Sequence, residues 1–138
     1  MAEALILDSE AVNALAHASE RAALAERARA ILTVAHERRA LVRVPAPVLA
    51  EVCRGRRLDA AVDRILNGRG IEAISLTPGC ARRAGALLAK ANLGSDHAVD
   101  AFVVATALEF GSAVIATGDP QDVSRLAAGH RQIRVFAI

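Results

Sequence analysis

The stretch DHAVDAFVVATALEFGSAVIATGDPQD, from Asp96 to Asp122, decides the fold. Its middle, AFVVATALEF, is apolar on nearly every face, so a helix there has to be buried on most sides. Gly111 is a typical helix stop, and the SAVIAT that follows is typical of a short buried strand. A helix that leads into a parallel strand begins at the sheet edge where that strand ends. We therefore expect Asp100, near the start of the helix, and Asp119, just past the strand, to share one edge of a sheet.

Strands and helices alternate along the rest of the chain. Helix patterns separate the apolar runs, and Pro78 and Pro120 stand where two of the predicted helices begin. This alternation predicts an α/β fold, with a parallel five-stranded sheet and helices on both faces. No repeat or linker divides the sequence, so we expect one domain over residues 1–138. The predicted strands are residues 4–7, 41–44, 71–76, 113–117 and 134–138.

The composition excludes several classes of protein. At 54% hydrophobic residues the chain can form a core, unlike a disordered protein, and a net charge of +2 permits a polyanionic partner without requiring one. Cys53 and Cys80 form no ligand-spaced cluster and are interpreted as small buried residues in a reducing compartment. The sequence starts with acidic residues and a short apolar run, which is not the pattern of a signal peptide. No apolar run is long enough to predict a membrane span. We therefore expect a cytoplasmic protein.

Four acidic residues are predicted to meet at the carboxyl edge of the sheet. Asp8 and Asp119 directly follow predicted strands, whereas Glu51 and Asp100 lie in the second turns of predicted helices. Right-handed crossovers bring these positions to the edge at which open α/β folds build their sites. Asp8 and Asp119 are also ordinary helix-cap residues, so each alone has a structural explanation. Glu51 and Asp100 are flanked by apolar residues, where an unpaired carboxylate is costly.

A cation would explain four carboxylates in one cleft. Two unit charges about 4 Å apart repel by about 4 kcal/mol at an effective dielectric constant near 20. The arginines nearest Glu51 in sequence fall at or beyond the end of its predicted helix, where they are poorly placed to neutralise it. Oxygen ligands without a histidine or cysteine set favour Mg²⁺ or Mn²⁺, and such an ion activates water and polarises a phosphodiester. No nucleophile–histidine set, Walker motif or dinucleotide-binding motif indicates another chemistry.

Four segments together resemble PIN domains of the VapC toxin type: LILDSEAVNAL, VPAPVLAEVCRG, VDAFVVATAL and ATGDPQDV. The resemblance covers nearly the whole chain and rests on the order and spacing of these segments. It implies a metal-dependent endoribonuclease, the toxin of a type II toxin–antitoxin pair, that binds a cognate antitoxin and forms a homodimer. The implied catalytic cluster is Asp8, Glu51, Asp100 and Asp119. Of these, Asp8, Asp100 and Asp119 would bind Mg²⁺ or Mn²⁺.

Three further polar residues are expected beside that cluster. Ser9 and Thr117 match hydroxyl positions of the family pattern and would orient carboxylates or water. Asp96 lies one helical turn before Asp100 and either extends the cluster or serves as a first-turn acid after a Ser95 cap.

The segment TGDPQD departs from the more usual TSDPDD-like form of the family. Gly118 stands in place of a hydroxyl and Gln121 in place of an acid. Asp119 and Asp122 are retained, so the departure concerns the surroundings of the site more than metal binding. Asp122 itself is interpreted as a residue that starts a helix.

RNA binding has to be explained without aromatic stacking, because the chain has no Trp or Tyr and only three Phe. Contacts to phosphates are the alternative, and arginines are their usual source. The candidates for substrate binding are Arg54, Arg56 and Arg57, with Arg82 and Arg83 as further ones. A solvated surface is the other explanation for each of them.

Other interpretations stay open at this stage. A PIN nuclease that is not a toxin would use the same chemistry, and an inactive PIN-fold binding module would keep the fold alone. Two further classes do not fit: a receiver-like domain needs a lysine after the last strand, which is missing, and a phosphatase of the DxD type needs an aspartate where Glu10 stands. The predicted helices between Glu10 and Ala35 are rich in alanine, with Leu24 and Ile31 interspersed. They would either form a groove for a partner helix or simply pack together.

Overall fold

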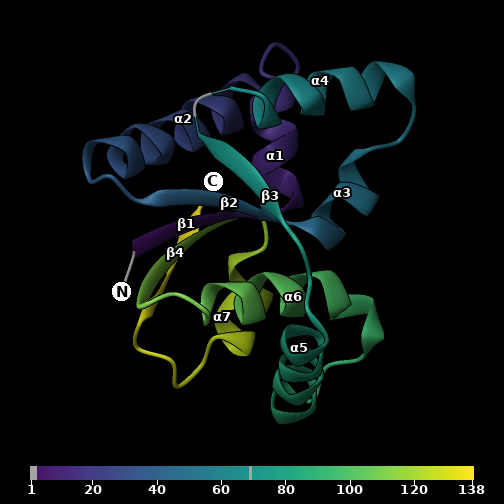
Figure 1. The fold of residues 1–138 in the computed structure, drawn as a ribbon, viewed down its shortest axis with the longest axis vertical. Helices are drawn as coiled ribbons and strands as arrows, with labels where there is room; N and C mark the ends of the chain where they lie inside the picture. Colours follow the sequence, from purple (N-terminus) through teal and green to yellow (C-terminus); the bar gives the residue numbers. More distant parts are fainter. Residues whose placement is uncertain (1–2, 69) are drawn as a thin grey trace.

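A parallel five-stranded sheet runs through the middle of the structure, with helices on both faces (Figure 1). The computed structural model describes residues 3–68 and 70–138. The strand order is β3-β2-β1-β4-β5, and every neighbouring pair is parallel. The predicted α/β class and five-stranded parallel sheet are thereby confirmed. The strands are β1 (Glu3–Leu7), β2 (Leu41–Pro45), β3 (Ile71–Ile74), β4 (Ser112–Thr117) and β5 (Ile133–Ala137).

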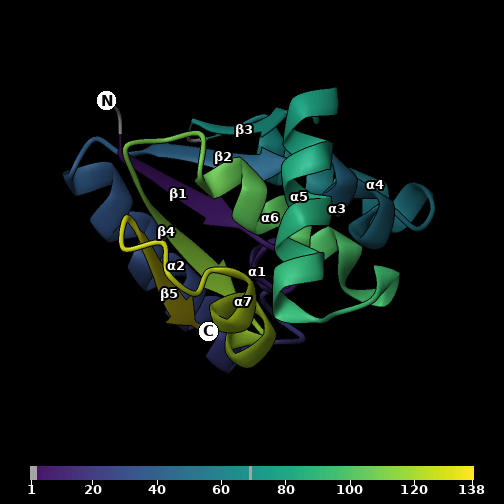
Figure 2. The ribbon, with the colours of Figure 1, turned by 90° about the horizontal axis from the view of Figure 1, so that it is seen from below.

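The helices form two layers, one on each face of the sheet (Figures 1 and 2). One layer contains α1 (Ser9–Ala16), α2 (Ala22–Glu37) and α4 (Arg56–Leu66). The other contains α5 (Pro78–Ala91), α6 (Ala98–Ala107) and α7 (Pro120–Leu126). The short helix α3 (Ala46–Val52) contacts both α1 and α6.

The order of the strands explains the two layers and places the site. From β1 the chain moves through β2 to β3 on one side, and it then returns past β1 to β4 on the other side. Right-handed crossovers in opposite directions put their helices on opposite faces. The connections therefore diverge between the carboxyl ends of β1 and β4, which is the position where open α/β sheets bind ligands.

Helix α6 is buried on most sides, as its apolar sequence predicts. Ala101, Val103, Val104 and Ala105 are fully buried, and the helix packs against the sheet and against both α5 and α7. Its last residue is Ala107, slightly earlier than the expected end near Gly111. Because the core holds this helix on all these sides, the residues of its first turn are fixed relative to the strands.

The expectation that Ser95 caps this helix was wrong. Ser95 instead begins a separate 3-10 turn, Ser95–His97, and α6 starts at Ala98 with His97 at its N-cap position. No side chain caps α6. Burial of its apolar residues stabilises the helix without a capping hydrogen bond. Among the described residues, none of the helices has the length and apolarity needed to cross a membrane.

Candidate active site

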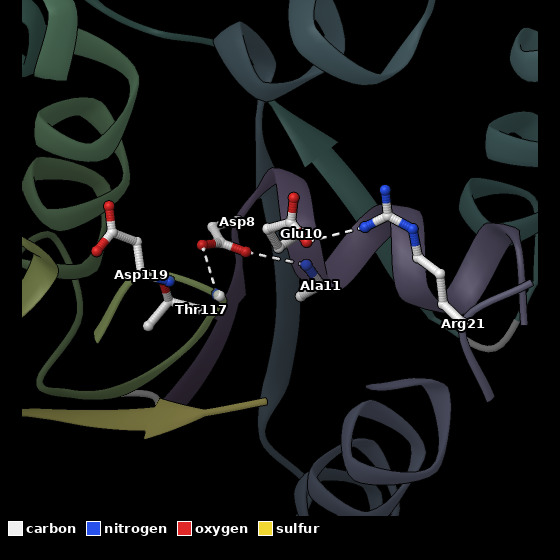
Figure 3. A network of polar contacts seen from close by, with 7 residues as sticks. Asp8, Glu10, Ala11, Arg21, Thr117 and Asp119 are labelled. Atoms are coloured by element: carbon white, nitrogen blue, oxygen red, sulfur yellow. Dashed lines mark hydrogen bonds and ion pairs between the residues drawn. The ribbon is translucent and has the colours of Figure 1, made fainter. Parts of the chain in front are cut away.

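Asp8 is buried where β1 ends, and its carboxylate is held by backbone amides (Figure 3). Oδ1 accepts a hydrogen bond from the amide of Ala11 at 2.9 Å, so Asp8 is the N-cap of α1. Oδ2 accepts one from the amide of Gly118 at 3.2 Å. Burial raises the pKa of Asp8, although the hydrogen bonds from Thr117, Ala11 and Gly118 lower it in part. The carboxylate thus joins the ends of β1 and β4.

Thr117 links two of the acidic positions through one hydroxyl group. Its side chain is fully buried at the end of β4, and it hydrogen bonds to Asp8. The same oxygen accepts a hydrogen bond from the amide of Asp119 at 2.8 Å. This hydrogen bond fixes the backbone of Asp119, so its exposed side chain extends from a rigidly held residue.

Asp100 lies in the first turn of α6, where it is half-buried and surrounded by like charge. Burial and then the carboxylates of Asp119, Asp8, Asp122 and Glu51, in decreasing order of effect, raise the pKa of Asp100 to about 6. A neighbouring carboxylate raises a pKa only when it is close enough for its charge to act on the group. The structure therefore brings the four acids expected from the sequence to one edge of the sheet, and Asp122 joins them.

Glu51 differs from the expectation that apolar neighbours bury it. Val48 and Val52 occupy the buried face of α3, so Glu51 projects outward and is exposed. Its Oε1 accepts a hydrogen bond from the hydroxyl of Ser9, at the start of α1. Glu51 is consequently a solvent-accessible acid at the margin of the cluster, held by the neighbouring helix.

Asp122 and His97 also lie at this cluster, which was not predicted from the sequence. Asp122 does lie in the first turn of α7, as expected, but it also faces the cluster. The Nδ1 atom of His97 lies 3.3 Å from Oδ2 of Asp122, and ligand atoms of His97, Asp100 and Asp122 all lie within 4.8 Å of one another. Their spacing in the sequence could have indicated this, because His97 precedes Asp100 by three residues and Asp122 follows Asp119 by three.

The other expected residues lie further from the centre of the cluster. The Asp96 side chain is 79% exposed and contacts Nε2 of His97 at 3.4 Å. Through this contact Asp96 borders the cluster. Arg54, Arg56 and Arg57 are exposed between the end of α3 and the first turn of α4, a few residues beyond Glu51.

The donor set fits a divalent cation that prefers oxygen. Carboxylates from β1, α6 and the β4–α7 connection converge, and burial and repulsion already raise the pKa of Asp100. An ion with two positive charges removes that repulsion, and carboxylate oxygens are the ligands of Mg²⁺ and Mn²⁺. Among the described residues, the ligand atoms of His97, Asp100 and Asp122 lie close together, and the carboxylates of Asp8 and Asp119 act on Asp100 through their charge.

Comparison with known proteins gives one family and several similar folds. The PIN domain family matches residues 5–129. A VapBC2 structure from Rickettsia felis, bound to a DNA fragment from the promoter, has a chain with a TM-score of 0.65 and 13% identity, covering 98% of each chain. A toxin–antitoxin complex from Klebsiella pneumoniae has one with a TM-score of 0.66 and 19% identity, covering 97% of this chain and 99% of the other. No curated protein gave a significant match.

Proposed function

The chain belongs to the PIN domain family, which is a family of nucleases, and from that premise we propose that it is a Mg²⁺- or Mn²⁺-dependent endoribonuclease. We further propose that residues 1–138 form one PIN domain acting in the cytoplasm as the toxin of a type II toxin–antitoxin pair. One observation carries the proposal: Asp8, Asp100 and Asp119 come from three separate segments and meet at the point where the sheet connections diverge. The fold alone does not require three acids there.

Each acid has a distinct part in the proposed reaction. A divalent ion bound by Asp8, Asp100 and Asp119 would supply an activated water and neutralise charge on the phosphodiester. The amides of Ala11 and Gly118 orient the Asp8 carboxylate, so that ligand is positioned before the ion binds. Glu51 is exposed at the margin and would accept the proton of the attacking water at a carboxylate oxygen.

Substrate binding in this proposal depends on phosphate contacts. Arg54, Arg56 and Arg57 are exposed just beyond the helix that carries Glu51, so an RNA backbone bound at the acidic cluster would pass close to them. Guanidinium groups bind phosphates without reading the bases. Target selection would then come from the shape of a single-stranded or looped RNA.

The partner in this proposal is an antitoxin, since both structures described above come from toxin–antitoxin systems. Of the two roles considered for the helices between Glu10 and Ala35, internal packing uses the buried face of α2, which contains Ala25, Ala28 and Leu32. A solvent-accessible groove of ≈ 270 Å³ lies beside α2 and is lined by Ile31 and Val34 together with residues of β1, β4 and β5. A homodimer, as the resemblance implies, belongs to the same proposal.

Arginines at this groove favour an acidic partner segment. Arg38 and Arg134 both contribute to its lining, Arg38 in an ion pair with Glu3 at 3.1 Å, while Val34 is 43% exposed within it. An amphipathic helix with an apolar face and acidic flanks matches such a groove.

Cleavage of a defined RNA by the purified chain tests the activity directly. With Mg²⁺ or Mn²⁺ we expect internal cuts in a single-stranded or hairpin-loop RNA, none with EDTA, and little cutting of DNA of the same sequence. Asp100→Asn and Asp119→Asn should abolish the cuts, whereas Glu26→Gln, on the exposed side of α2, should retain them. Cutting that survives EDTA or both variants would show a contaminating nuclease. Intact RNA with the wild-type protein, together with metal binding, would favour the binding module.

A further inference from the structure

We infer that His97, together with Asp100 and Asp122, adds a nitrogen ligand to the proposed metal site, so that the site binds a first-row transition ion in preference to Mg²⁺. This inference rests on the proposed function, because it concerns the ion at the same edge of the sheet. It departs from the all-oxygen site expected from the sequence. The grounds are the geometry of the three side chains, their burial and the chemistry of imidazole.

The distances suit one shared ion. Two ligand atoms each about 2.1 Å from an ion lie about 3.0 Å apart at right angles and about 3.4 Å apart in a tetrahedral arrangement. The Nδ1 atom of His97 and the Oδ2 atom of Asp122 are 3.3 Å apart, within that interval. Asp100 completes a set in which all ligand atoms lie within 4.8 Å of one another.

Two helices that pack against each other position these three residues. His97 occupies the N-cap position of α6, three residues before Asp100, so both lie on one side of the helix start. Asp122 comes from the first turn of α7, which packs against α6. The side chains of His97 and Asp122 are each only 25% exposed, unlike the freely exposed Asp96. The set is thus part of the fold and not a chance encounter of surface charges.

Imidazole changes which ion the site prefers. Mg²⁺ binds oxygen ligands and keeps several waters, so a nearby imidazole adds little to its binding. Ions such as Co²⁺, Ni²⁺ and Zn²⁺ gain substantially from an imidazole ligand. Loss of the ring should therefore affect the two kinds of ion unequally.

The competing role for His97 is that of a cation paired with Asp96 and Asp122, since each of its ring nitrogens faces one of these carboxylates. A positive charge at that position would repel every divalent ion. Its removal would strengthen the binding of Mg²⁺ and of Co²⁺ alike. The two roles therefore predict opposite signs for the Co²⁺ affinity of a variant without the imidazole.

The test compares the full chain with His97→Asn, His97→Gln and a control, His130→Asn. His130 precedes β5 and so lies at the opposite edge of the sheet from the site. Calorimetric titration with Co²⁺ and with Mg²⁺ measures both affinities, and pulsed electron paramagnetic resonance of the Mn²⁺-loaded protein detects directly bound nitrogen. Circular dichroism establishes that each variant is folded.

We expect both His97 variants to bind Co²⁺ at least about tenfold more weakly, the smallest loss typical even for residues that only support metal ligands. Mg²⁺ affinity should stay within about twofold, and the nitrogen signal should vanish in the His97 variants and persist in His130→Asn. Unchanged or tighter Co²⁺ binding by the His97 variants, with no nitrogen signal in the wild type, would overturn the inference and leave the proposed nuclease intact. Absence of any divalent-ion binding in the wild type would overturn both.

Discussion

Gly118 lies directly against Glu10: a Cβ atom placed on Gly118 would be 2.5 Å from Cγ and 2.6 Å from Cβ of Glu10. Glu10 is held there by an ion pair with Arg21 at 2.9 Å (Figure 3). The Gly118 amide also donates a hydrogen bond to Asp8. This contact gives a physical reason for glycine at the position where the family pattern more often has a hydroxyl residue.

Gly118→Ala should destabilise the fold by about 1–3 kcal/mol, the usual cost of overpacking. A rotation of the Glu10 side chain cannot relieve the clash, because the Cβ of Glu10 is itself too close. Gly85→Ala is the matched control, since Gly85 lies within α5 with no atom near its missing Cβ. That change should stabilise the protein by about 0.5–1 kcal/mol. Urea unfolding measures both, and a neutral Gly118→Ala would contradict the contact.

Two buried threonines allow a matched test of the hydroxyl that links Asp8 to Asp119. Thr117→Val removes a hydrogen bond to the Asp119 amide and one to Asp8, so we expect a loss of about 1–3 kcal/mol and weaker metal binding. Thr106→Val, also buried, removes only a contact of 3.8 Å with the sulfur of Cys80. Its cost should be below about 1 kcal/mol. Equal losses in the two variants would show that the Thr117 hydroxyl has no special part.

Without metal, stability should fall as the pH rises through the range set by Asp100. Its pKa is raised from 3.8 to about 6, so between these values the folded protein keeps a proton that the unfolded chain has lost. The carboxyl of Asp100 therefore adds to the free energy of unfolding below about pH 4, and this contribution is lost above about pH 6. The raised pKa of Asp8 acts in the same direction. Urea unfolding with EDTA at several pH values measures the slope.

Asp100→Asn supplies the control for that slope. The variant should be more stable than the wild type at neutral pH and should lose most of the decline between about pH 4 and 6. Glu26→Gln, away from the cluster, should retain the decline. A wild-type stability that rises over this interval would mean that the acids hold the fold together in the absence of metal.

A charge in the groove beside α2 should weaken the complex with an antitoxin. Val34→Glu places a carboxylate on an apolar side chain that lines the groove, whereas Thr33→Glu places the same charge on an exposed neighbour outside it. Light scattering of the chain co-purified with a candidate antitoxin, such as any small protein encoded beside its gene, measures the complex. We expect Val34→Glu to lose it and Thr33→Glu to keep it. Loss in both variants, or in neither, would place the partner elsewhere.

The sequence predicted the sheet well, because periodicity and helix signals are local properties. The apolar run of α6 has to be buried whatever surrounds it, and that single inference places Asp100 beside the sheet. Asp8 and Asp119 follow strands directly, so their edge of the sheet depends only on strand direction. These predictions needed no knowledge of side-chain contacts.

What the sequence could not give depends on contacts between distant segments. The exposure of Glu51 depends on which side of a short helix the core takes, and apolar neighbours on both sides in sequence do not settle that. The place of His97 follows from the 3-10 turn before α6, whose geometry aims the ring at Asp122 on another helix. The contact between Glu10 and Gly118 likewise joins residues far apart in the chain.

Calorimetric titration with Mn²⁺ tests most directly whether these acids form one divalent-cation site. The wild type and Glu26→Gln should bind Mn²⁺ with equal affinity. Asp8→Asn and Asp100→Asn should bind it at least about tenfold more weakly, because each removes a proposed metal ligand. Equal Mn²⁺ affinity in all four proteins, each folded by circular dichroism, would contradict the site and with it the proposed chemistry.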